Sequence, residues 1–184
     1  MTNIQLFLKN ILLKRIVVSF FFSTIIFFNS FTQENSLLDT LKKANNSNQV
    51  DVLITYAKKY LGTPYRSAGT TPSGFDCSGF ISFVFSNFGI PLVHSSYGMA
   101  EFGETVKLAD IRPGDLMFFK GRNVNSSRIG HVAMVVDVKE DGIYFIHSSS
   151  SNGVIINNFK TSKYYIARYV TTKRLDFGQK FQKK

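Results

Sequence analysis

Cysteine is almost absent from this chain, in which Cys77 is the only one among 184 residues. A single cysteine cannot form an internal disulfide, so that form of stabilisation is excluded. No cysteine lies directly after the apolar segment near the N-terminus, so a lipid-anchored lipoprotein is not indicated. In an exported protein a leftover thiol is a free reactive group or an intermolecular partner, and an oxidising compartment disfavours an idle one. We therefore expect Cys77 to have a function, against the alternative of an inert buried cysteine.

Other kinds of site are missing from the sequence as well. No cluster of His, Cys, Asp and Glu suggests a metal, and we expect neither a metal nor a cofactor. The glycine-rich stretch 62–74 lacks the Lys-Ser/Thr ending of a phosphate-binding loop. We find no internal repeat and no second domain. With 19 Phe and 8 Tyr, the chain is rich enough in apolar residues for one packed domain.

The first 32 residues have the pattern of a secretory signal peptide. Three basic residues precede an apolar run of 13 residues at 16–28, and small residues follow at 30 and 32. This run is short for a membrane span, which needs about 20 residues. Cleavage after residue 32 is therefore preferred over an uncleaved membrane anchor. We expect an exported protein, located in the periplasm or outside the cell.

Two further segments flank the domain that we predict at 50–170. Residues 33–49 are polar and are predicted as a linker or a short helix. The tail 171–184 contains five basic residues and one acidic residue. Outside the cytoplasm, such a tail suggests contact with anionic envelope polymers or a membrane surface rather than nucleic acid, although a solvated end fits equally well. We expect a monomer with no nucleic-acid partner.

The periodicity of apolar residues changes along the predicted domain. Helical spacing predicts helices at 50–62 and 77–89, each ended by a glycine, and a shorter helix near 96–102. After the turn at 112–115, short β-branched and aromatic runs predict five strands, at 116–120, 131–138, 143–149, 153–159 and 164–170. Helices followed by an antiparallel sheet indicate an α+β fold.

Cys77 lies at the predicted start of the second helix, where its thiol could become a nucleophile. Asp76 can cap this helix, which leaves Cys77 in the first turn. The unpaired backbone N–H groups there favour a thiolate and could donate to an oxyanion. Ser78 and Gly79 keep the approach to the sulfur open.

Two of the three histidines stand where a catalytic base is needed. His131 begins one predicted strand and His147 ends the next, so an antiparallel pairing brings them near each other. A two-residue turn at 141–142 would place them on opposite faces of the sheet, whereas a three-residue loop at 139–141, or a bulge, would place them on the same face. His131 would then exchange the proton and His147 would orient it. We interpret His94 as a surface or groove-lining residue.

In these residues the chain resembles the NlpC-type family of bacterial cell-wall cysteine endopeptidases. The similarity lies in "GFDCSGF", "RPGDLMFF", "GHVAMV" and "FIHSSSSNGV", which occur in the family's order. It implies a papain-like fold, with N-terminal helices packed on a five-stranded, mostly antiparallel sheet. It also implies hydrolysis of an amide bond in peptidoglycan stem peptides, commonly the γ-D-glutamyl to diamino-acid bond. The family's nucleophile, base and third polar residue fall on Cys77, His131 and His147.

The resemblance also implies a substrate pocket. The residues concerned are Tyr65, Asp76 and Ser78. A carboxylate such as Asp76 suits the free amine of a trimmed stem peptide, which would favour trimmed stems over intact cross-linked wall. Ser67 and Ala68 depart from the aromatic residue and glycine that are frequent in the family, which bears on substrate preference. Two alternatives stay open: an amidase or acyltransferase on another amide, and a non-catalytic wall-binding module.

Overall fold

The computed structural model describes residue 40 and residues 49–176. By internal contacts the chain divides into residues 1–45 and residues 46–184, and the fold below belongs to the second unit. The predicted signal peptide 1–32 lies outside the described residues, as does almost all of the linker. None of the helices in the described part is long and apolar enough to cross a membrane.

Helices come first in this unit and strands dominate its second half. A helix covers 49–58, and a left-handed Gly62 follows it, so the helix ends earlier than predicted. The elements that follow, in chain order, are β1 (Thr70–Thr71), β2 (Gly74–Phe75), α2 (Cys77–Ser86), α3 (Ser96–Met99), β3 (Glu104–Val106), η1 (Leu108–Asp110), β4 (Leu116–Lys120), β5 (Ile129–Lys139), β6 (Gly142–Ser149), β7 (Gly153–Asn158), α4 (Lys163–Ile166) and β8 (Tyr169–Arg174).

The main sheet has six strands in the order β3-β8-β4-β5-β6-β7, and every neighbouring pair is antiparallel. This confirms the α+β class, but the predicted count of five strands is wrong. Strand β3 was missed because its three residues are too few for a recognisable alternation. The run 164–170 is not one strand, because Ser162 caps a short helix α4 before β8 begins. Strand β8 continues to Arg174, so the sheet ends four residues beyond the predicted domain boundary.

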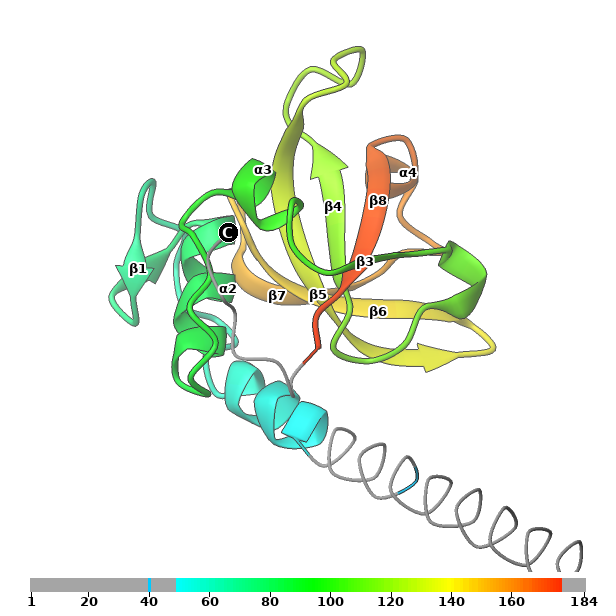
Figure 1. Ribbon diagram of the computed structural model, residues 1–184. Coiled ribbons are helices and arrows are strands. Elements are labelled where there is room, and N and C mark those ends of the chain that lie inside the picture. Colours follow the sequence, from blue (N-terminus) through cyan, green and yellow to red (C-terminus); the bar gives the residue numbers. More distant parts are fainter. Residues whose placement is uncertain (1–39, 41–48, 177–184) are drawn as a thin grey trace, which may run out of the picture. The chain divides into compact units, whose positions relative to one another are not determined.

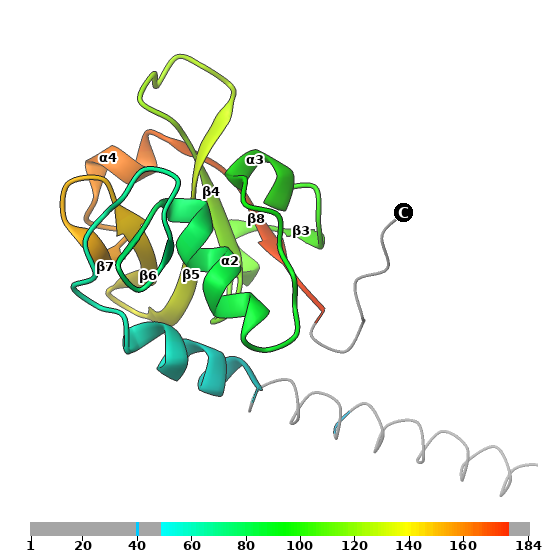
Figure 2. The same cartoon turned by 90° about the vertical axis from the view of Figure 1, so that its left-hand side faces the viewer.

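Apolar residues cover both faces of this sheet. Alternate residues of β4 and β5 point to opposite sides: Phe118 and Met134 join the core beneath the helices, whereas Phe119 and Val135 join a second core on the other face. Helix α2 contacts β5 and β6, and Figures 1 and 2 both show it packed along one side of the sheet. The sheet therefore holds α2 in a fixed place, and with it the first residue of that helix.

A bulge in β5 sets the register that matters for the site. Lys139 pairs with Gly142 around a two-residue turn at 140–141, so neither of the predicted turns is correct. The pairing then shifts at Val136, and beyond this extra residue Met134 lies opposite Ile146. This is the register that the three-residue loop would have given. It places His131 and His147 on the same face of the sheet.

Candidate active site

Cys77 is the first residue of α2, as predicted. Asp76 has extended backbone and caps the helix, since its Oδ1 accepts a hydrogen bond of 2.7 Å from the backbone N–H of Gly79. The glycine at 79 is required by a close approach: a Cβ atom there would lie 2.0 Å from the carbonyl oxygen of Gly69. The glycine-rich loop can therefore pack against the first turn of the helix.

The sulfur of Cys77 lies where strands β5 and β6 part. The ladder between these strands ends at Met134 and Ile146. Beyond that point the backbone N–H of Val132 donates to the sulfur of Cys77. The thiol is thus held beside the start of β5, next to the residue that follows His131.

The thiol and the two imidazoles of the site are neutral at rest. Burial, followed by the charge of Asp76, raises the pKa of Cys77 although nearby backbone N–H groups lower it. Burial lowers the pKa of His131 to about 3 and that of His147 to about 4. The expected lowering of the thiol pKa by the helix N-terminus is therefore outweighed by desolvation. The resting site pairs a thiol with a neutral imidazole, and not a thiolate with an imidazolium.

His131 and His147 are in direct contact, as their shared face predicts. Nε2 of His131 lies 3.0 Å from Nδ1 of His147, and the two rings are nearly perpendicular. His147 is fully buried. Its second nitrogen, Nε2, lies 2.8 Å from Oδ1 of Asn157 on β7 and 3.4 Å from the hydroxyl of Tyr165.

This chain of contacts determines the tautomer of each ring. The Oδ1 atom of Asn157 can only accept, so Nε2 of His147 carries a proton and Nδ1 of His147 is an acceptor. Nε2 of His131 must then donate to that acceptor. Nδ1 of His131 keeps its lone pair and is the nitrogen that can accept a proton. The arrangement can therefore take a proton from a thiol and return it to a leaving group.

The residues predicted to bind substrate surround the same thiol. Tyr65 is 37% exposed and forms an isolated β-bridge with Phe75, two residues before Cys77. Burial raises the pKa of Tyr65, and the charges of Cys77 and Asp76 raise it further, which places all three groups in one neighbourhood. Ser78 is nearly buried, and its hydroxyl donates to Oδ1 of Asp76 at 3.1 Å. Ser78 thus supports Asp76 and presents little of its own surface.

Residues 62–174 match the NlpC/P60 family, over more than half of the chain. The chain belongs to the NlpC/P60 family. A similar solved structure is an NlpC/P60 family protein from Bacillus cereus ATCC 10987, at 32% identity and a TM-score of 0.61, over 69% of this chain and 40% of that one. The papain-like α+β fold is thus confirmed.

Two curated relatives carry names that describe an activity. The Gamma-DL-glutamyl hydrolase of Bacillus subtilis (strain 168) is 36% identical over 126 residues, which are 68% of this chain and 30% of the relative. The Murein DD-endopeptidase MepS/Murein LD-carboxypeptidase of Escherichia coli (strain K12) is 34% identical over 115 residues, 62% of this chain and 56% of the relative. The chain thus matches well under two thirds of the length of either relative.

Two residues of this NlpC/P60 site were missed in the sequence analysis, and the contact made by a third, His94, was not predicted. Asn157 and Tyr165 contact His147 from β7 and α4, and neither belongs to a recognisable motif. His94 lies in a loop between α2 and α3, and its Nε2 is 2.9 and 2.8 Å from the two oxygens of Asp76. Contacts between side chains that lie far apart in the sequence are not marked by any local sequence pattern. Within the described residues, no group of three or more His, Cys, Asp or Glu side chains could hold a metal ion.

Proposed function

We propose that this NlpC/P60 protein is an exported cysteine endopeptidase that cleaves peptidoglycan stem peptides. The observation that carries the proposal is the contact series from His131 through His147 to Asn157, at 3.0 and 2.8 Å, beside the helix start that carries Cys77. A thiol at a helix start and an imidazole of defined tautomer are the requirements of thiol-dependent amide hydrolysis. A module that only binds the wall needs neither.

The proposed bond joins γ-D-glutamate to the diamino acid. One curated relative is named a Gamma-DL-glutamyl hydrolase and the other a Murein DD-endopeptidase and LD-carboxypeptidase, and the first matches more of this chain at slightly higher identity. The substrate would then place L-alanine and γ-D-glutamate on the acyl side of the scissile amide. The apolar run and cleavage pattern at 1–32 support export to the periplasm or beyond.

Each step of the reaction uses a group whose position has been described. Nδ1 of His131 takes the proton of the Cys77 thiol as the sulfur bonds to the carbonyl carbon, and the carbonyl oxygen becomes an oxyanion. Backbone N–H groups at the start of α2 stabilise this charge. The proton on His131 passes to the amine as the C–N bond breaks, which leaves a thioester. A water molecule then attacks the thioester, its proton passing through His131 to the departing sulfur.

Mass spectrometry of purified stem peptides after incubation with the protein tests this proposal. We expect cleavage at the γ-D-glutamyl bond that is lost in Cys77→Ala and in His131→Ala. Tyr97→Ala is a matched control, because Tyr97 is 58% exposed on α3. If the folded protein with a reduced thiol cleaves neither intact nor trimmed stems, the endopeptidase proposal fails, and a binding module or another amide substrate takes its place.

A further inference from the structure

His94 and Asp76 are joined by hydrogen bonds at the edge of the active site. Both oxygens of Asp76 lie within 2.9 Å of Nε2 of His94, and the side chains are 34% and 15% exposed. The same carboxylate accepts from the backbone of Gly79 and the hydroxyl of Ser78. A carboxylate offers about four lone-pair positions. Three different groups therefore already occupy Asp76 before any substrate arrives.

The imidazole is held in this position from both sides of its loop. On one side the hydroxyl of Ser82 in α2 donates to the carbonyl oxygen of Leu92 at 2.7 Å. On the other side Ser95 caps α3. The ring also lies against the helix start, since a Cβ atom on Gly79 would be 3.1 Å from its Nε2. The contact of His94 with Asp76 is thus built into the fold of this loop.

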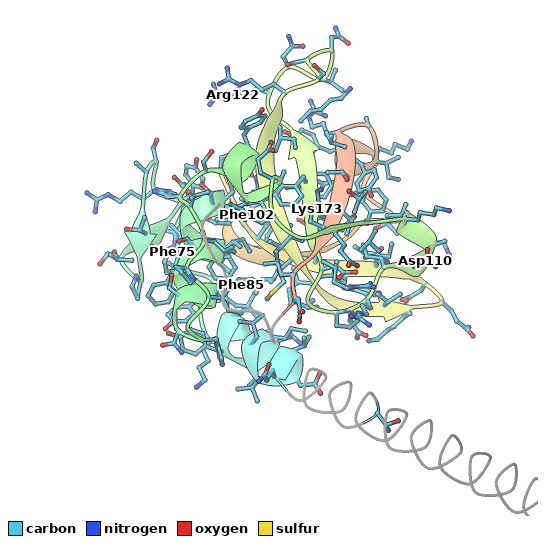
Figure 3. All side chains as sticks on the ribbon, viewed as in Figure 1. Phe75, Phe85, Phe102, Asp110, Arg122 and Lys173 are labelled. Atoms are coloured by element: carbon cyan, nitrogen blue, oxygen red, sulfur yellow. The ribbon has the colours of Figure 1, made fainter. Side chains whose placement is uncertain are left out.

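Asp76 is the acidic group that acts on the reacting atoms. Its charge raises the pKa of both Cys77 and Tyr65. A basic group also acts on Tyr65, since Arg122 lowers the pKa of that phenol. Figure 3 shows Arg122 at the base of the β4–β5 loop, above α3. With His94, Gly79 and Ser78 already on its oxygens, the carboxylate of Asp76 has little hydrogen-bonding capacity left for an ammonium group.

We propose that His94 closes Asp76 to the amine of the substrate, so that the site takes stem peptides whose L-alanine nitrogen is acylated. Such stems are those of the intact wall, in which this nitrogen is an uncharged amide. The inference rests on the proposed function and names its substrate class. It reverses the expectation from the sequence, in which a free Asp76 selects trimmed stems with a free amine.

The test compares two substrates that differ only at the amino terminus. These are L-alanyl-γ-D-glutamyl-diaminopimelate with a free amine and the same peptide with an acetylated amine. We expect the wild-type protein to cleave the acetylated peptide at least as well, by kcat/KM. In His94→Ala the free-amine peptide should gain about tenfold relative to the acetylated one, because Asp76 becomes available for a charge-assisted hydrogen bond.

Two further variants separate this role from a merely structural one. His94→Gln keeps a neutral N–H donor for Asp76, so its substrate ratio should stay near the wild-type value. Tyr97→Ala changes an exposed residue of the adjacent helix and should leave the ratio unchanged. A wild-type preference of tenfold or more for the free amine, reduced in His94→Ala, would overturn the proposal, because His94 would then be orienting Asp76 toward the amine.

Binding to the Cys77→Ala variant distinguishes this inference from the proposed function. The dissociation constants of the two peptides are measured by calorimetry with Cys77→Ala and with the double variant that also carries His94→Ala. A shift of about tenfold toward the free amine in the double variant supports the role of His94 even if the wild-type protein cleaves neither peptide. An unchanged ratio contradicts that role even if γ-glutamyl cleavage is observed.

Discussion

Asn157 offers the sharpest test of the catalytic arrangement, because it touches neither the thiol nor the scissile bond. In Asn157→Leu the buried Nε2 of His147 loses its acceptor at 2.8 Å, and the hydroxyl of Tyr165 remains at 3.4 Å. His147 is fully buried, so water cannot replace the lost partner. The proton of His147 is then no longer held on Nε2.

The cost follows from leaving a buried donor unpaired, which is about 1–3 kcal/mol. That energy disfavours the productive tautomer and favours the one with a proton on Nδ1 of His147. In this second tautomer Nε2 of His131 must accept, so its Nδ1 carries a proton and cannot receive one from Cys77. We expect kcat to fall about 10- to 100-fold, while KM changes by less than about twofold.

The assay measures kcat and KM separately on a stem tripeptide, together with the nitrogen NMR shifts of the two imidazoles. Asn157→Asp keeps an acceptor and adds charge, so it should retain the tautomer and raise the pKa of His147. Asn158→Leu is a control in the same strand, where the side chain of Asn158 contacts the 140–141 turn. A folded Asn157→Leu variant with kcat within twofold of wild type would refute the tautomer argument.

The remaining predictions concern stability. Arg174→Met should lower the free energy of unfolding by about 3 kcal/mol, measured in urea titrations. The reason is that Asp115 is 1% exposed and would lose both 2.8 Å hydrogen bonds from the guanidinium of Arg174. A loss below about 0.5 kcal/mol would contradict the stabilising role of this buried pair. Ending the chain after 170 should therefore unfold it, whereas ending it after 176 should not. The low pKa values of His131 and His147, about 3 and 4, mean that below about pH 6.5 the unfolded chain binds protons that the folded chain does not. The free energy of unfolding should accordingly fall from pH 6.5 to pH 4, and a flat profile would contradict the buried neutral state.

Much of the fold could be predicted because its signals are local. The start of α2 follows from a capping Asp76 before an apolar stripe, and four of the strand predictions rest on short β-branched and aromatic runs. The failures have physical causes. The run 164–170 is apolar and aromatic throughout, and its composition does not reveal that Ser162 starts a helical turn before the last strand. Strand β3 is recognisable only through its partner β8.

The candidate site, like the fold, could be predicted only in part from the sequence. Cys77, His131 and His147 could be named because each lies at or near the end of an element, and the antiparallel pairing of β5 and β6 brings the two histidines together. The pKa of the thiol was misjudged, since the helix N-terminus is visible in the sequence and the extent of burial is not. Asn157 and His94 depend on side-chain contacts across the fold, so only three-dimensional coordinates reveal them. The basic residues of 177–184 lie beyond the described part, and the proposed envelope contact of the tail stays a prediction.

The bulge at Val136 makes the alignment of His131 with His147 independent of the length of the hairpin tip at 140–141. The register that places His131 and His147 on the same face is set inside β5, several residues away from the exposed turn at 140–141. Insertions at that tip, such as an epitope or a docking peptide, could lengthen the loop without exchanging the faces of either strand. A deletion at Val136 would leave the same tip intact and turn one histidine away from the other. The hairpin tip is thus the place where this fold can accept new sequence, while the extra residue Val136 keeps the two histidines on one face of the sheet.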